Sequence, residues 1–284
     1  MTNPLLTPSA LEYELPPFES INDGHYREGF EVGMAEQKAE IASIIALGNP
    51  VTFDNTVVAL ERSGATLTRV SNIFFNKSSS DTNDEIDAIE AEFAPLLSAH
   101  EDSIMLNPDL FARISWLYEN RASLGLDEDD SWLLELYYKD FVHAGAALEA
   151  DKRERLKAIN EELSTLETQF SKNVLADSND LAIVIDDERE LAGLTKSQIA
   201  SASKAAESRG LSGKWLITMV NFTGHPLLAS LENRELREKI MKASLSKGDR
   251  GNEFDTKSIA KRMAKLRAER AALDRKSTRL NSSH

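Results

Sequence analysis

The sequence predicts a mainly α-helical protein that carries one small two-stranded β insert. Apolar residues recur at spacings of three, four and seven along most of the 284-residue chain, which is the pattern of amphipathic helices. Two short runs, at residues 181–185 and 215–220, instead combine β-branched or aromatic residues with turn residues at their borders. Hydrophobic residues make up 41% and charged residues 28%, so the chain can bury a sizeable core.

Boundary signals place the first two helices. Asn22 or Asp23 can cap the first helix, and the turn residues at 48–50 end it. The second is expected to run without a break from about residue 55 to residue 76, because its apolar residues keep helical spacing throughout. The serine-rich stretch at residues 78–81 is then expected to be a loop.

Capping signals also mark the helices of the middle of the chain. Residues 82–85, Thr-Asn-Asp-Glu, match a capping box at the start of one helix. Pro108 suits the first position of the next, because proline lacks the N–H that goes unpaired there, and residues 124–125 should stop it. Another helix carries the apolar residues from Trp132 to Val142, and residues 149–174 are typical of one long amphipathic helix.

Further helices are expected between and after the two predicted strands. Thr195 caps a polar helix that lies between the strands and reaches Ser208, and Gly210 stops it. Asn233 caps the helix that follows at residues 234–244. A last helix begins near Asp255.

Composition excludes several classes of protein. The 47 acidic residues exceed the 33 basic ones, and the resulting net charge of −14 argues against nucleic acid or an anionic membrane as a partner. The absence of cysteine excludes a disulfide framework, a Cys-ligated zinc site and a thiol nucleophile. No apolar run approaches the roughly 20 residues that span a bilayer, and the N-terminus lacks the features of a signal peptide. A cytoplasmic protein is therefore expected.

Histidine spacing does not predict a metal site. The five histidines are His25, His100, His143, His225 and His284. A helical zinc motif of the H-E-x-x-H type needs two histidines one turn apart, and His100-Glu101 is followed by Ile104 at the second ligand position. His100 is therefore expected to be an exposed helix residue and His143 a half-buried one. His225 is expected to be a loop residue, although its turn after a strand is also suited to contact a ligand.

Acidic and aromatic groups likewise favour structural roles. The acids at residues 127–130 are expected to offset the dipole at a helix N-terminus rather than to hold a cation, and those at 186–188 to form a solvated turn. Five aromatic residues are expected in the core rather than on a stacking platform: Trp116, Tyr118, Trp132, Tyr137 and Tyr138. Serine-nucleophile and phosphate-loop motifs are absent. We therefore expect no catalytic, cofactor-binding or metal-ligating residue in this chain.

Short motifs along the chain together resemble one family of enzymes. They include Leu-Pro-Pro-Phe at residues 15–18, His-Tyr-x-x-x-Phe-x-x-Gly-Met at 25–34 and a run at 53–70. Further matching segments lie at residues 82–85, 110–113, 123–127, 141–146, 214–217, 237–239 and 266–269. The set spans nearly all of residues 4–273. It resembles the N-terminal part of peptidyl-dipeptidases in the thimet-oligopeptidase and oligopeptidase A family of zinc metallopeptidases.

The resemblance implies a deep-channel helical peptidase whose N-terminal helices form one wall and the lid of a cleft. In that family a zinc ion, held by H-E-x-x-H and a further glutamate, activates water, and the motif glutamate is the general base. Short unstructured peptides are cut to release C-terminal dipeptides. This chain is well under half of the family's usual length and carries none of those ligands. The resemblance therefore implies an inactive N-terminal part, with zinc and the catalytic residues in a missing C-terminal half.

The end of the chain has a different character. Residues 274–284 match the translation of a common sequencing adapter, so they are expected to be a non-native, exposed tail. Residues 1–273, in which no internal repeat or interdomain linker is evident, are expected to be one partial helical region.

The alternative hypothesis is a stand-alone acidic helical protein with a binding or scaffold role and no catalysis. A scaffold protein should end in a capped helix or a polar tail, whereas a truncated peptidase should end inside an apolar helical pattern. Residues 261–273 do end inside such a pattern, which favours the peptidase.

Overall fold

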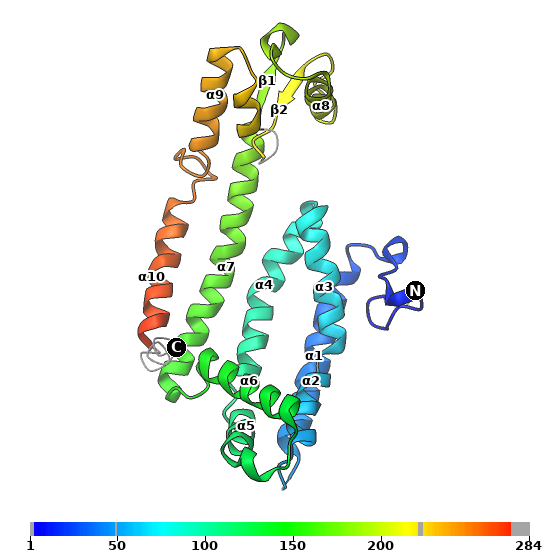
Figure 1. Ribbon diagram of the computed structural model, residues 1–284, viewed down its shortest axis with the longest axis vertical. Coiled ribbons are helices and arrows are strands. Elements are labelled where there is room, and N and C mark those ends of the chain that lie inside the picture. Colours follow the sequence, from blue (N-terminus) through cyan, green and yellow to red (C-terminus); the bar gives the residue numbers. More distant parts are fainter. Residues whose placement is uncertain (1–2, 49, 221–223, 274–284) are drawn as a thin grey trace. The chain divides into compact units, whose positions relative to one another are not determined.

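The computed structural model describes residues 3–48, 50–220 and 224–273, and these residues form two compact units (Figure 1). The first unit comprises Met1–Thr165 with Lys265–His284, and the second comprises Leu166–Ala264. The predicted mainly α-helical class is confirmed, because helices account for most of the described residues. None of the described helices is both long and apolar enough to cross a bilayer. The expected tail at residues 274–284 lies outside the described residues.

The first unit is a set of packed helices. They are α1 (His25–Ala46), α2 (Ala59–Arg62), α3 (Ala65–Ser80), α4 (Asp84–Met105), α5 (Pro108–Asn120) and α6 (Glu128–Ala144), with part of α7 (Ala150–Asp180) and of α10 (Lys257–Leu273). Its largest core cluster lies among α1, α3 and α4 and is made by Leu5, Tyr26, Phe30, Leu67, Val70, Ile73, Phe74, Ile86, Ile89 and Phe93. Phe30 stands at its centre, with ring centroids 5.1 Å from Phe74 and 5.0 Å from Phe93. Aromatic burial of this kind supplies much of the stability of a small core.

Helices α1 and α3 cross at very short range because α1 presents glycine at the crossing. A Cβ atom placed on Gly33 would lie 2.9 Å from the backbone N and Cα of Leu67. One turn earlier, a Cβ on Gly29 would lie 3.0 Å from a methyl group of Val70. Any side chain at Gly33 would therefore push the two backbones apart.

The single helix expected over residues 55–76 is interrupted. A π-helical turn, Asp54–Val58, leads into α2, and the chain then turns at Gly64, whose φ of +73° is left-handed and suits glycine. The Gly64 N–H donates to Oε2 of Glu40 on α1 at 2.7 Å, so a long-range contact holds this break. Helix α3 continues to Ser80, so the loop expected at residues 78–81 is also mostly wrong.

Most other helix starts follow their capping residues. Asn107 caps α5, with Pro108 at its first position as expected. Asp127 caps α6, and the three acids that follow it lie in the first turn, where the expected cluster offsets the dipole. Helix α4 is capped by Asn83 alone, so the Thr82 capping box does not form. The residue before α1 is Gly24, which has no side chain to cap the helix, so the expectation of Asn22 or Asp23 is wrong. Helix α7 runs six residues beyond its expected end.

The second unit contains the β insert. Strands β1 (Ile183–Ile185) and β2 (Trp215–Ile217) pair antiparallel, with Val184 opposite Leu216, so both predicted strands are confirmed, although each is shorter than expected. The unit also contains α8 (Lys196–Glu207) and α9 (Arg234–Leu245). The C-terminal part of α7 and the N-terminal part of α10 belong to it as well. Its core cluster is made by Ile185, Leu191, Ile217, Met219, Leu227, Leu231, Leu236 and Ile240. Thr195 and Gln198 form a capping box on α8, and Asn233 caps α9, as predicted.

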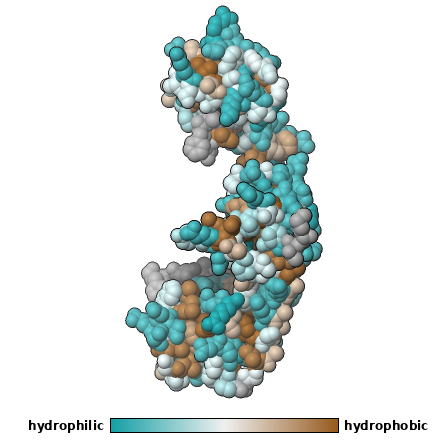
Figure 2. Space-filling model, turned by 90° about the vertical axis from the view of Figure 1, so that its right-hand side faces the viewer, coloured by the Kyte–Doolittle hydropathy of each residue, from teal (hydrophilic) through white to brown (hydrophobic). Residues whose placement is uncertain are grey.

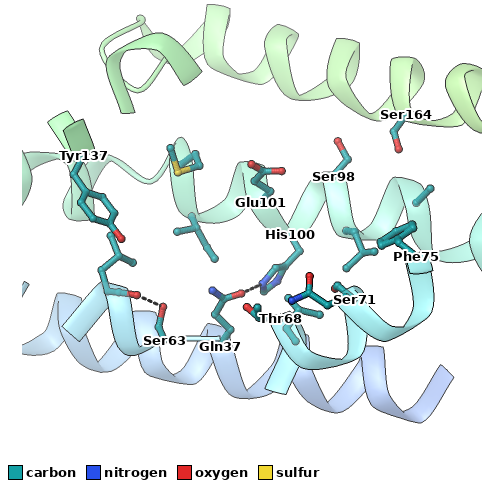
Figure 3. A pocket seen from close by; sticks show the side chains of 17 residues that line it. Gln37, Ser63, Thr68, Ser71, Phe75, Ser98, His100, Glu101, Tyr137 and Ser164 are labelled. Carbon is teal, nitrogen blue, oxygen red and sulfur yellow. Dashed lines mark hydrogen bonds between the residues drawn. The ribbon is translucent and has the colours of Figure 1, made fainter. Parts of the chain in front are cut away.

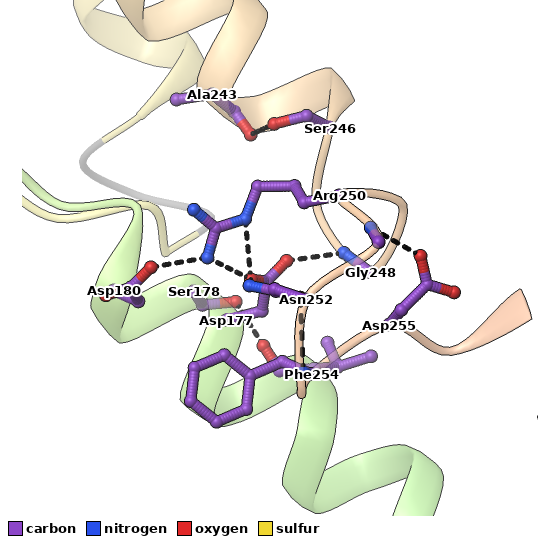
Figure 4. A network of polar contacts seen from close by, with 12 residues as sticks. Asp177, Ser178, Asp180, Ala243, Ser246, Gly248, Arg250, Asn252, Phe254 and Asp255 are labelled. Carbon is purple, nitrogen blue, oxygen red and sulfur yellow. Dashed lines mark hydrogen bonds and ion pairs between the residues drawn. The ribbon is translucent and has the colours of Figure 1, made fainter.

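A buried carboxylate fastens the loop after α9 to the end of α7 (Figure 4). Asp177 is fully buried, and its oxygens accept hydrogen bonds from the Gly248 N–H at 2.6 Å, from Arg250 Nε at 2.8 Å and from Asn252 Nδ2 at 3.2 Å. Arg250 also pairs with the exposed Asp180. Burial by itself would raise the pKa of the Asp177 carboxyl, but the hydrogen bonds from the loop outweigh burial and hold that pKa below its ordinary value.

Candidate functional site

The candidate site is an open pocket of about 660 Å³ in the first unit (Figure 3). Helix α1 contributes Gln37, α3 contributes Thr68, Ser71, Asn72 and Phe75, and α4 contributes Ser98, His100 and Glu101. The remaining lining residues are Leu60, Ser63, Leu67, Ala94, Leu97, Ile104, Met105, Tyr137 and Ser164. A volume of this size is typical of sites for small molecules.

Hydroxyl and amide groups on the pocket wall are free to bind a ligand. Among the described residues, no hydrogen bond to the protein is made by the side chains of Thr68, Ser71, Asn72, Ser98 and Ser164. The Ser63 hydroxyl differs, because it donates to the Leu60 carbonyl at 2.8 Å. Groups that can both donate and accept thus lie beside the apolar side chains of the same pocket.

His100 is buried, so the expectation that it would be exposed is wrong. Only 4% of its surface is accessible, and its Nε2 lies 2.7 Å from Oε1 of Gln37. Burial, with a smaller contribution from the charge of Lys38, lowers its pKa, so the ring is neutral at pH 7. Its Nδ1 is buried without a partner among the described residues. Phe93, His100 and Ile104 are spaced by seven and four residues, so the histidine lies on the buried face of α4. This hydrophobic spacing predicts its burial, whereas the spacing between histidines does not.

The other described histidines lie apart from one another. Both ring nitrogens of His25 are within hydrogen-bonding distance of Asn22, at 3.1 and 3.2 Å. His143 is exposed rather than half-buried as expected, and His225 is exposed at the start of a short 3₁₀ turn. His284 lies outside the described residues. Within the part of the chain that the structure describes, no group of three or more His, Cys, Asp or Glu side chains could hold a metal ion. The described residues therefore do not form a site that fits zinc.

A polar pair lies beside the pocket where α4 meets α7. Nδ2 of Asn160 donates to both oxygens of the half-buried Asp102, at 2.9 and 3.1 Å. Burial raises the pKa of Asp102 to about 6, and the neighbouring charge of Glu101 adds to the shift. Both oxygens of Asp102 are thus engaged by Asn160, and neither residue lines the pocket itself.

The aromatic residues expected in the core are divided between two environments. Trp116 and Trp132 are 44% and 65% exposed, so the core expectation is wrong for them. Tyr118 and Tyr138 are half-buried and stack at a centroid distance of 4.0 Å, with Arg121 over the Tyr118 ring. The face of the molecule in Figure 2 shows hydrophobic side chains reaching the surface in small patches among hydrophilic ones. Solvent-facing helix positions can thus carry large apolar residues.

The remaining aromatic residue, Tyr137, lines the pocket. Its hydroxyl donates to Oε1 of Glu61 at 2.6 Å. Burial and the hydrogen bond to Glu61 both raise the pKa of Tyr137, so the phenol is neutral. Its O–H is donated to Glu61 and is not free for a ligand.

The acidic clusters have the structural roles that were predicted. Asp127 accepts the Asp130 N–H at the start of α6. Asp187 accepts the Arg189 N–H in a turn, and Asp186 pairs with Lys214.

Several polar residues from the motifs that carry the family resemblance form a buried hydrogen-bond network in the first unit. Arg113 is 8% exposed and donates to Oγ1 of Thr56 at 3.2 Å, to the Leu47 carbonyl at 2.7 Å and to Oδ1 of Asn55 at 2.9 Å. These acceptors are neutral, and burial lowers the pKa of the guanidinium. The network holds the π-helical turn to α5 and to the end of α1, so these residues support the helices.

Comparison with known proteins finds relatives that are peptidases. It is 39% identical over 271 residues, or 95% of its length, to dipeptidyl carboxypeptidase of Escherichia coli (strain K12). It is 39% identical over 272 residues to dipeptidyl carboxypeptidase of Salmonella typhimurium, and 27% identical over 277 residues to oligopeptidase A of Escherichia coli. No family model matches the sequence.

Over nearly its whole length the chain is therefore similar to a stretch of about two fifths of the peptidases named dipeptidyl carboxypeptidase and oligopeptidase A. The higher identity to dipeptidyl carboxypeptidase agrees with the peptidyl-dipeptidase branch that the sequence motifs resemble. The match covers 40% of each of these relatives, so the chain spans about two fifths of their length.

Proposed function

We propose that residues 1–273 are the N-terminal part of a zinc-dependent peptidyl-dipeptidase. The observation that carries the proposal is the identity of 39% to two dipeptidyl carboxypeptidases, against 27% to oligopeptidase A over nearly the same residues. The substrates are short unstructured peptides, from which the whole enzyme releases C-terminal dipeptides. Residues 274–284 are proposed to be a non-native, adapter-derived tail.

In this proposal the described helices supply a non-catalytic wall of the substrate cleft. The zinc ligands and the general base lie in the C-terminal catalytic half, which is the principal partner of this region. The enzyme acts in the cytoplasm, without nucleic acid or membrane as a partner. The net charge of −14 supports the last point, because phosphate surfaces repel an acidic protein.

The 284-residue chain alone is expected to be inactive. After purification and incubation with zinc, it should hold no stoichiometric metal and should release no dipeptide from a blocked oligopeptide. The reason is that its described histidines are far apart along the chain and that Gln37 engages Nε2 of His100. Metal analysis and mass spectrometry of the digest check this, with dipeptidyl carboxypeptidase of Escherichia coli as the positive control. One tightly bound zinc per chain that is lost in His100→Gln would contradict the expectation.

A pair of chimeras tests the branch assignment. Residues 1–273 replace the matched region of Escherichia coli dipeptidyl carboxypeptidase in one chimera and of Escherichia coli oligopeptidase A in the other. Each mismatched buried contact costs about 1–3 kcal/mol, so the first chimera should retain at least about tenfold more of its parent's activity than the second. Peptide hydrolysis by both purified chimeras is the measurement. Folded but inactive products in both cases would instead favour the stand-alone scaffold.

A further inference from the structure

We propose that the pocket between α1, α3 and α4 binds the amino-terminal residue of a short peptide. The peptide's ammonium group lies at Glu101, its first side chain packs on the apolar wall, and its main chain meets the free hydroxyl and amide groups. The choice of a peptide rests on the proposed function. The choice of a free amino end rests on the pocket itself.

The charge of the pocket favours a cation. The ionisable side chains that line it are His100, Tyr137 and Glu101. His100 is a neutral ring held by Gln37, and the Tyr137 phenol is bonded to Glu61, so Glu101 is the charged group among the described lining residues. Lys38 lies near enough to act on His100, but it does not line the pocket. A ligand that brings a positive charge therefore gains attraction, and one that brings a carboxylate meets repulsion.

The polar groups of the pocket are suited to a peptide main chain. Thr68 and Ser71 lie on the α3 side, and Ser98 and Ser164 lie on the opposite side in Figure 3. A hydroxyl group both donates and accepts, and the Asn72 amide does the same with separate atoms, so together they can satisfy an N–H and a C=O that are two or three bonds apart. Because these side chains have no protein partner among the described residues, a ligand replaces only water on them and breaks no hydrogen bond within the described protein.

The apolar wall provides the contact for a side chain. Leu67, Leu97 and Ile104 line the pocket together with Phe75, which is 41% exposed. Covering such a ring removes apolar area from water, and an aromatic or aliphatic first residue offers a matching surface. A volume of about 660 Å³ accepts the first one or two residues of a peptide, but not a folded chain.

Binding of two probe peptides to the full 284-residue chain tests the proposal. The probes are phenylalanyl-glycinamide, which has a free amino group, and N-acetyl-phenylalanyl-glycinamide, which does not. One favourable charge contact in water is worth about 1 kcal/mol, so the free peptide should bind about fivefold more tightly in calorimetric titration. Equal affinities, or no saturable binding of either probe, would overturn the proposal.

Two variants and a control locate the effect. Glu101→Gln should bring the two affinities together, whereas Glu119→Gln, which removes an exposed carboxylate of α5 outside the pocket, should leave the fivefold preference unchanged. Phe75→Ala should weaken both probes and keep the preference. Loss of the preference in Glu119→Gln would overturn the site. Binding requires no catalysis, so the two tests can be told apart. If the probes do not bind, the chimera result still stands. If the chimeras fail but the probes bind, the pocket is a site for an amine that is not a substrate.

Discussion

Replacing Asp177 with alanine is expected to lower the free energy of unfolding of the second unit by about 3 kcal/mol. The change removes the acceptor of the Gly248 N–H and the buried partner of Arg250, so a buried donor is left unpaired and the guanidinium keeps only the exposed Asp180. Urea denaturation measures the loss. Hydrogen exchange read by mass spectrometry should show that the loop between α9 and α10 becomes less protected.

Asp180→Ala is the matched control, because Asp180 pairs with the same guanidinium but its side chain is 55% exposed. An exposed ion pair contributes only about 0–1 kcal/mol, so this variant should stay close to the unsubstituted protein. Equal losses in the two variants would show that burial of Asp177 is not the cause. Because the pKa of Asp177 is lower in the folded protein, its contribution is present above its ordinary pKa of 3.8 and is lost as the pH falls through its folded pKa.

Gly33→Ala is expected to destabilise the first unit by about 2 kcal/mol, although alanine is the better helix former by about 1 kcal/mol. The added Cβ would lie 2.9 Å from the backbone of Leu67, and a backbone cannot move aside as a side chain can. Separation of α1 from α3 would also loosen the packing of Phe30 on Phe74. Thermal and urea denaturation give the size and the sign of the effect.

Gly48→Ala provides the comparison, since a Cβ at Gly48 meets no atom within 4 Å. Its effect should stay within about 0.5 kcal/mol. A stabilising Gly33→Ala would mean that helix propensity dominates and that the crossing of α1 and α3 tolerates a methyl group.

Local chemistry made much of the secondary structure predictable. The starts of α5, α6, α8 and α9 depend on a side-chain oxygen and an N–H two or three residues away, so the sequence near each start is sufficient to predict it. The two strands were found for a similar reason, because short β-branched runs between turn residues disfavour helix locally.

Features that depend on distant residues were not predictable in this way. The break at Gly64 is held by Glu40, which lies 24 residues earlier, so the helical spacing on either side of the break concealed it. His100 is buried because Gln37 of another helix accepts its N–H, and Trp132 is exposed because no element covers its face of α6 among the described residues. Sequence spacing reports the period of a helix, but not which neighbour covers each of its faces.

The sequence by itself determined the mainly α-helical class, most helix starts, the β insert and the resemblance to peptidases. These depend on local hydrogen bonding, on the hydrophobic period and on the order of motifs. Only the tertiary structure decided the division into two units, the glycine crossing of α1 and α3, the burial of Asp177 and the composition of the candidate pocket. The physical reason is the same in each case. A pocket or a buried charge arises where side chains far apart in the sequence meet, and its energy depends on all of them at once.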